Sequence, residues 1–152
     1  MTVLTRALDL RRAAYEVIEH PRTDTAVAEA NALGVAADEV AKTIVLVTPE
    51  GHLRAVLPAS ERLDLARVRE LLGEGKAVHL ASEEELARDY PMFELGAVPP
   101  VGGPSDPVLV DRHTANRESV IVEAGTHRES VLMKTADLLA MTHAEVADIC
   151  ER

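Results

Sequence analysis

One short apolar segment constrains the fold of this chain more than any other feature. Residues 44–47, Ile-Val-Leu-Val, form an uninterrupted β-prone run, which favours a strand that is buried on both faces. Residues 48–51, Thr-Pro-Glu-Gly, follow with Pro at the second position and Gly at the fourth, as a type I turn prefers. Residues 53–58 then return as a second apolar run, so the sequence predicts a β-hairpin.

Lys42 places a positive charge at the mouth of this hairpin. Burying a lysine ammonium is costly unless the group is paired or used in chemistry. A lysine at a strand end commonly extends its ammonium into solvent, and position alone favours that alternative. The residues that accompany Lys42 further along the chain favour a functional role instead.

Helical and strand patterns alternate along the rest of the chain. Strands are expected at 15–20, 76–80, 108–110, 119–123 and 130–133. A first helix is expected around Leu4 and Leu8. Two more are expected over 26–33 after a Thr25 cap and over 65–72 after an Asp64 cap, and a fourth from Ser82 to Pro91. The last two are expected after a Thr135 cap and after a Thr142–Glu145 capping box. These elements predict one α/β domain over residues 1–152, with a mixed, mostly antiparallel, barrel-like sheet and surrounding helices.

Composition narrows the classes of function. At 152 residues the chain is long enough for one sizeable core. A formal net charge of −10 argues against a broad basic face for gripping DNA or RNA, and only 2 Tyr and 1 Phe are present to stack on single strands. Cys150 is the only cysteine, so the chain can form neither an internal disulfide nor a Cys-based zinc site. With neither a signal peptide nor a membrane span in the sequence, we expect a cytoplasmic protein with no membrane partner.

Residues 96–104, Gly-Ala-Val-Pro-Pro-Val-Gly-Gly-Pro, are the stretch richest in glycine and proline. The stretch lies between patterned elements, so it predicts a structured functional loop and not a linker. A simple turn is the alternative, although the length and stiffness of the segment favour function.

The common catalytic motifs are missing from the sequence. The 6 histidines are scattered without the i, i+4 spacing of a helical zinc site, and neither a Gly-x-Ser-x-Gly elbow nor a nucleotide-binding glycine loop occurs. We therefore expect no metal and no cofactor. An enzyme built on this chain must catalyse a reaction that needs little from its side chains.

Seven short motifs give the chain a resemblance to a known family. In order along the chain they are His20-Pro21, Thr25-Ala26, Leu33-Gly34-Val35, Val40-Ala41-Lys42-Thr43, Leu57-Pro58-Ala59, Arg62-Leu63-Asp64 and Gly96-Ala97-Val98-Pro99-Pro100. Together they resemble the YbaK family, which comprises free-standing aminoacyl-tRNA deacylases and the editing domain inserted in bacterial prolyl-tRNA synthetases. The similarity extends over roughly residues 20–139.

The resemblance implies hydrolysis of the ester that joins a wrong amino acid to the acceptor end of a tRNA, usually proline tRNA. Lys42 matches the essential lysine of the family, and Gly96 and Pro100 match its Gly-x-x-x-Pro loop. Asp111, after a valine-rich strand, and His127, which follows Gly125 by two residues, match further family positions. Alanine-specific free-standing members tend to have asparagine after the lysine, whereas this chain has Thr43.

An aminoacyl ester is already activated, so a positioned water and oxyanion stabilisation can suffice. Backbone N–H groups around Gly96, Ala97 and Val98 are expected to approach the ester. Lys42 is expected to anchor the terminal adenosine or its phosphate, and His127 to contact the amino group of the substrate.

Several residues have simpler alternative roles. Thr43 and Ser60 are expected to line the pocket, yet hydroxyls beside strands commonly satisfy backbone groups. Asp111 at a strand end is more often a turn cap than a catalyst. His127 lies at an expected hairpin tip, where histidines are usually exposed.

The sequence thus predicts a trans-editing hydrolase that works on the aminoacyl-tRNA acceptor end. The acidic charge suggests that a synthetase or an elongation factor delivers the substrate. The main alternative is a non-catalytic module of the same fold that binds tRNA or a synthetase, since retained pocket residues would also serve binding. A small-molecule hydrolase that uses the same pocket is the third alternative.

Overall fold

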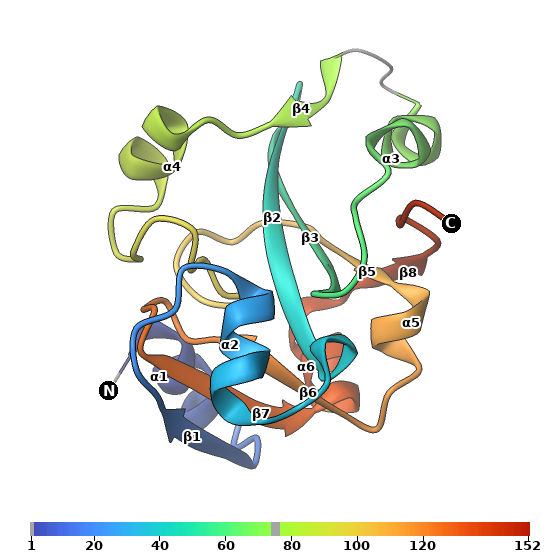
Figure 1. Cartoon of the computed structure of the whole chain (residues 1–152). Helices are drawn as coiled ribbons and strands as arrows, with labels where there is room; N and C mark the ends of the chain where they lie inside the picture. Colours follow the sequence, from blue (N-terminus) through green and yellow to red (C-terminus); the bar gives the residue numbers. More distant parts are fainter. Residues whose placement is uncertain (1, 74–76) are drawn as a thin grey trace.

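The computed structural model describes residues 2–73 and 77–152 (Figure 1). Its helices are α1 (Val3–Leu10), α2 (Ala26–Leu33), the short 3-10 helix η1 (Ala37–Glu39), α3 (Leu65–Leu72), α4 (Glu83–Asp89), α5 (Arg112–Ala115) and α6 (Thr135–Thr142). Its strands are β1 (Tyr15–Glu19), β2 (Val40–Thr48), β3 (Gly51–Pro58), β4 (His79–Leu80), β5 (Val108–Asp111), β6 (Ser119–Glu123), β7 (Glu129–Lys134) and β8 (Glu145–Ala147).

The described strands form one mixed sheet in the order β1-β7-β6-β2-β3-β5-β8, with β4 added to β2. The pairs β1–β7, β6–β7, β2–β3 and β2–β4 are antiparallel, and the pairs β2–β6, β3–β5 and β5–β8 are parallel. The predicted α/β class and the mixed, mostly antiparallel sheet are therefore confirmed. Figure 1 shows β2 as a long strand through the centre of the molecule.

Core side chains fill both faces of this sheet. On one face α1 and α6 cover a cluster that includes Leu4, Val56 and Leu138, each 0% exposed. On the other face α2 packs over the start of β2 and over β6 through Ala30, Val40 and Ile121. Since side chains alternate along a strand, these contacts fix which face each residue of β2 and β6 occupies.

Most predicted elements lie where the sequence placed them. The Thr25, Asp64 and Ser82 caps each accept the expected backbone hydrogen bond, and Gly34 and Gly73 end their helices in the left-handed conformation. The strand expected over 76–80 is formed at His79–Leu80, and Lys76 lies outside the described residues.

Two predictions near the C-terminus are wrong. Thr135 is not a cap but the first residue of α6, and its buried hydroxyl has no partner among the described residues. Thr142 and Glu145 open no helix, because His143 ends α6 in a left-handed conformation with φ of 51° and β8 follows. Parallel pairing of β8 with β5 replaces the expected helix.

No helix in residues 2–73 or 77–152 has the length and apolar character needed to cross a membrane.

Candidate functional site

The sheet opens along one edge of β2, and this opening defines the candidate site. β6 pairs with β2 only at Val40 and Ala41, and β4 pairs with it only at Leu46 and Val47. Within the described chain, the edge of β2 between these two contacts has no ladder partner. We call residues 42–44 the open edge, because the Val45 carbonyl already accepts the Ala81 N–H at 3.0 Å. Exposed strand edges offer unpaired backbone groups to a ligand.

Lys42 is the first residue of the open edge and is partly buried. It lies opposite Leu57 of β3 and makes no ion pair with a described residue. Burial lowers the pKa of the Lys42 ammonium, and the nearby Arg62 guanidinium lowers it further, whereas Cys150 opposes the shift. The side chain is thus a desolvated cation that no other side chain neutralises, which suits contact with an anionic substrate group.

The glycine–proline loop faces the open edge. Gly96 has φ of 81°, a left-handed conformation that favours glycine, and its backbone is exposed. Ala97 donates its N–H to the Glu94 carbonyl at 3.0 Å, which forms a tight turn. The Gly96 and Val98 N–H groups donate to no described residue. Free backbone amides are the donors that an oxyanion needs.

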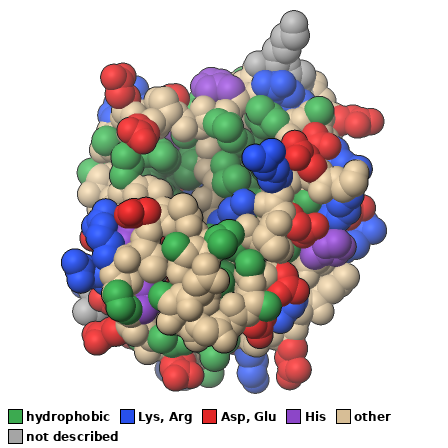
Figure 2. Space-filling view, viewed as in Figure 1, with side chains coloured by type: hydrophobic (Ala, Val, Ile, Leu, Met, Phe, Trp, Pro, Cys, Tyr) green, Lys and Arg blue, Asp and Glu red, His purple; other side chains and the backbone are tan. Residues whose placement is uncertain are grey.

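A pocket of about 220 Å³ lies between the open edge and this loop. Thr43, Gly96 and Val98 line it, together with residues of β4 and α4 such as Leu80 and Leu86. Figure 2 shows this face of the molecule hollowed near its middle, with hydrophobic and basic side chains around the hollow. The structure therefore brings together three of the predicted pocket residues, with Lys42 next to Thr43 on β2.

Arg54 of β3 holds the loop from behind, and the sequence interpretation missed it. The side chain is 1% exposed. It donates hydrogen bonds to three loop carbonyls and one carboxylate, those of Pro99 at 2.9 Å, Gly102 at 2.7 Å, Pro104 at 3.0 Å and Asp106 at 2.9 Å. An arginine inside the apolar run of residues 53–58 was the available signal, because a buried arginine needs several acceptors.

Tyr90 completes this support. Its hydroxyl donates to Asp106 at 2.6 Å, and its ring lies 5.3 Å from the Arg54 guanidinium. Burial and the Asp106 carboxylate raise the Tyr90 pKa well above its usual value. Tyr90 therefore stays a neutral donor, and the two residues fix Asp106 at the end of the loop.

His127 supports the other end of the loop. It is 6% exposed, so the alternative of an exposed histidine at a hairpin tip is wrong. Its backbone N–H donates to the Glu94 carboxylate at 2.8 Å, and its Nε2 donates to the Leu95 carbonyl at 2.6 Å. A Cβ on Gly96 would lie 3.5 Å from the imidazole Cε1. His127 therefore contacts the loop directly behind Gly96.

Gly125 has a structural reason to be glycine. Its φ is 93°, and a Cβ there would lie 2.8 Å from Phe93 Cδ1. Its carbonyl also accepts the Glu94 N–H at 2.8 Å. Gly125 thus lets the turn after β6 approach the segment that leads into the loop.

The remaining predicted residues lie outside the 220 Å³ pocket. Ser60 is exposed and lines a separate hollow with residues of α5 such as His113. Pro100 is buried and borders another hollow, where α1 and α6 meet the loop. Pro100 therefore belongs to the body of the loop and not to the wall that faces Lys42.

Asp111 is fully buried and serves as the N-cap of α5. It accepts hydrogen bonds from the His113 and Ile149 N–H groups at 3.0 Å each, and from Arg152 at 2.8 Å. These contacts agree with the capping alternative and tie the C-terminal segment to β5.

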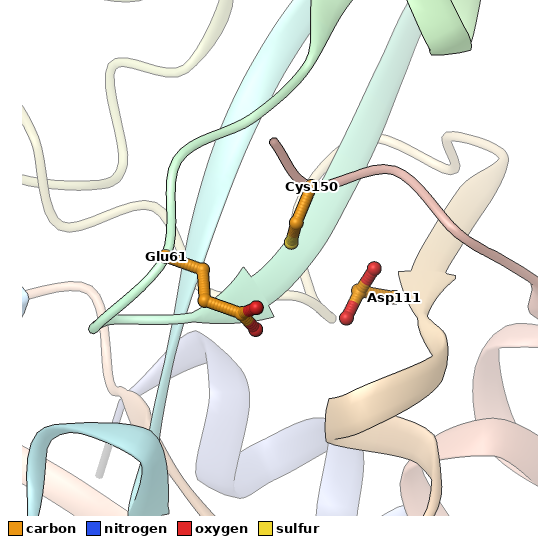
Figure 3. A group of neighbouring side chains, drawn as sticks. All are labelled: Glu61, Asp111 and Cys150. Carbon is orange, nitrogen blue, oxygen red and sulfur yellow. The ribbon is translucent and has the colours of Figure 1, made fainter. Parts of the chain in front are cut away.

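Glu61, Asp111 and Cys150 lie together in three dimensions (Figure 3). Burial, and then the Asp111 carboxylate, raise the pKa of the Cys150 thiol to about 12, so the thiol stays protonated. Arg152 approaches Glu61 and Asp111 at 3.5 and 2.8 Å. Arg152 thus pairs with both carboxylates, and Asp111 also caps α5, so these contacts give the group a structural role. The contacts of Arg152 with Glu61 and Asp111 hold the C-terminal segment in place, and Cys150 of this segment lies near Lys42.

Comparison with known proteins agrees with this architecture. The family model described as "Aminoacyl-tRNA editing domain" matches residues 20–141. This match covers most of the chain and includes β2 and the glycine–proline loop. The chain therefore belongs to the aminoacyl-tRNA editing domain family, the YbaK family. No curated protein gives a match.

Two solved structures illustrate the relationship. One, described as "a putative trans-editing enzyme for prolyl tRNA synthetase", has 30% identity and a TM-score of 0.86, over 98% of this chain and 95% of the other. The other, "hypothetical protein APE2540", has 27% identity and a TM-score of 0.88, over 97% of this chain and 99% of the other. The chain thus resembles these proteins over nearly their full length.

Proposed function

We propose that this protein hydrolyses the ester bond of mischarged aminoacyl-tRNA. The observation that carries the proposal is the pocket between the open edge of β2 and a rigid loop, which Gly96 and Val98 line with free amides and where partly buried Lys42 directly precedes Thr43. Membership in the aminoacyl-tRNA editing domain family supports aminoacyl-tRNA as the class of substrate that binds at this pocket. The reaction needs neither a metal nor a cofactor from these residues.

The chemistry follows from the charge that develops during ester hydrolysis. Water attacks the ester carbonyl, and the carbonyl oxygen becomes negative in the tetrahedral intermediate. Preorganised N–H groups and a cation stabilise that oxygen more strongly than they stabilise the neutral ester. The Gly96 and Val98 amides supply the N–H groups, and Lys42 supplies the positive field or anchors the terminal adenosine. The ribose oxygen leaves with a proton from solvent.

Rigid support is part of this mechanism. A loop that keeps its amides in place loses no free energy by reorganising when charge develops. Arg54 and His127 fix the loop from its two ends through the Pro99 and Leu95 carbonyls. We assign both as positioning residues, because neither borders the pocket between the loop and β2.

The pocket size favours a small aminoacyl group. A volume of about 220 Å³ holds a short side chain but not both a large side chain and an adenine ring. The similarity to a protein described as a prolyl-tRNA synthetase trans-editing enzyme favours proline tRNA carrying a wrong small amino acid. Thr43 lines this pocket and is the residue that differs from the asparagine of alanine-specific members.

The net charge of −10 favours a limited contact with tRNA. We infer that the protein touches the acceptor end and little else, and that a synthetase or an elongation factor delivers the substrate in the cytoplasm. A non-catalytic module that binds tRNA or a synthetase through the same loop is the second candidate, since free amides and a lysine would also bind an uncleaved ester.

A deacylation screen tests the proposal. Proline tRNA charged with alanine, cysteine or serine is incubated with the protein, and other tRNA families serve as controls. We expect single-turnover hydrolysis of at least one mischarged proline tRNA and little effect on correctly charged prolyl-tRNA. Binding of the charged acceptor end without any hydrolysis would instead identify the non-catalytic module.

A further inference from the structure

The buried Glu29 and the partly buried Glu123 lie near the start of the open edge, and the proposed mechanism does not use them. Glu29 of α2 is 1% exposed, and its Oε1 has no hydrogen-bond partner among the described residues. Its other oxygen accepts a hydrogen bond from the hydroxyl of Ser130, which is 0% exposed. A buried carboxylate oxygen without a donor is costly, so it calls for a ligand.

Glu123, the last residue of β6, lies next to this group. It is directly opposite Ser130 in the antiparallel β6–β7 pair, so the two side chains share one face with Cβ atoms about 5 Å apart. Burial, and then the negative charge of Glu29, raise the pKa of Glu123 to about 8. Neither glutamate forms an ion pair with a described cation. His20 lies 2.9 Å from the Ser130 hydroxyl. Burial raises the pKa of Glu29, while the Ser130 hydrogen bond and the nearby His20 and His127 lower it in part.

The sheet register places Glu123 beside Lys42. The parallel β2–β6 pair matches Val40 with Ile121 and Ala41 with Val122, and Lys42 and Glu123 follow directly. Val40 and Ile121 both pack under α2, so alternation puts Lys42 and Glu123 on that same face. The pairing ends at Ala41 and Val122, so the two strands separate at this point. Glu123 therefore lies where β6 parts from β2, at the end of the open edge.

We propose that Glu123, backed by the unpartnered oxygen of Glu29, binds the α-ammonium group of the aminoacyl ester. The proposal rests on the proposed function. An aminoacyl ester carries its ammonium two bonds away from the ester carbonyl. A carbonyl held by Lys42 and the Gly96 amide therefore brings the ammonium to the neighbouring strand, where neither glutamate has an ion-pair partner. Binding of the ammonium releases to solvent the proton that burial keeps on Glu123. The site would distinguish an acyl group that carries a free α-ammonium from an acyl group without this positive charge.

A matched pair of ligands tests the proposal without relying on catalysis. Both are stable amides of 3′-amino-3′-deoxyadenosine, one with an alanyl group and one with a lactyl group, which replaces the ammonium by a hydroxyl of similar size. We expect the wild-type protein to bind the alanyl ligand at least tenfold more tightly in calorimetry. Equal affinities of the wild-type protein for the two ligands would overturn the proposal, whatever any variant does.

Variants locate the effect. Glu123→Gln should weaken binding of the alanyl ligand about tenfold and leave the lactyl ligand within twofold. The matched control is Glu118→Gln, at an exposed residue just before the opposite end of β6. An unchanged preference in a folded Glu123→Gln protein would also overturn the proposal. Preference for the alanyl ligand without hydrolysis of any aminoacyl-tRNA would reject the proposed function alone, and hydrolysis without that preference would reject this inference alone.

Discussion

The Arg54 guanidinium donates a hydrogen bond to the Pro99 carbonyl across 2.9 Å, from the middle of the sheet to the middle of the glycine–proline loop. Two further loop carbonyls, those of Gly102 and Pro104, accept from the same side chain. Proline cannot donate a backbone hydrogen bond, so this loop has few internal contacts of its own. Its shape therefore depends on a residue of the strand behind it.

Replacement of Arg54 should cost both stability and activity. Arg54→Met would leave the Asp106 carboxylate, whose side chain is 8% exposed, without its cation. Breaking a buried ion pair by removing one partner typically costs ~3–5 kcal/mol. We expect a loss of this size in urea unfolding, with Arg54→Lys falling between Arg54→Met and the wild-type protein. Arg6→Met, at an exposed position on α1, is the control, and equal stability of the Arg54 and Arg6 variants would contradict the assigned role.

Lys42 should affect hydrolysis far more than it affects folding. It makes no ion pair with a described residue, so Lys42→Ala removes a desolvated charge without leaving a partner buried. Loss of one preorganised electrostatic contact costs ~2.7–4 kcal/mol in the transition state, or roughly 10²–10³ in rate. Single-turnover deacylation measures the rate, and thermal melting measures the fold. The matched control is Lys134→Ala at an exposed position on β7. A near-normal rate in folded Lys42→Ala would remove Lys42 from the mechanism.

His127 should act on all substrates alike. Because its Nε2 is bonded to the Leu95 carbonyl, the imidazole is held against the loop that serves every substrate. His127→Ala should lower hydrolysis of alanyl and cysteinyl esters on one tRNA about tenfold, since ~1.4 kcal/mol corresponds to a factor of ten. The ratio of the two rates should stay constant. A changed ratio would show that His127 contacts the aminoacyl group, as the family resemblance implies.

Local patterns predicted most of the elements but not the contacts between them. Helix caps at Thr25 and Asp64 act within one turn of chain, so neighbouring residues suffice to recognise them. Residues 145–147 form a strand only because they pair with β5, far away in the sequence. A capping pattern at Thr142 and Glu145 contains no information about that pairing.

The candidate site divides in the same way. Lys42 and Gly96 were predicted from the family resemblance. Lys42 lies on the open edge of β2, and Gly96 lines the pocket between that edge and the loop. Arg54, Glu29 and Glu123 went unrecognised, since their significance comes from burial and from partners on other strands. Arg54 alone gave a signal in the sequence, as a charge inside an apolar strand.

Glu123 should make the stability of the protein fall as pH rises. Its pKa is raised from 4.5 to about 8 in the folded state, first by burial and then by Glu29. Between these two values the folded state holds a proton that the unfolded state has lost. The free energy of unfolding therefore decreases with pH, by at most ~1.4 kcal/mol per pH unit from this group. Glu123→Gln cannot ionise, so its stability should exceed that of the wild-type protein at pH 8 by more than it does at pH 5. Urea unfolding at the two pH values measures this difference, with Glu118→Gln as the control, and parallel pH profiles of the wild-type and Glu123→Gln proteins would show that the carboxyl group titrates normally.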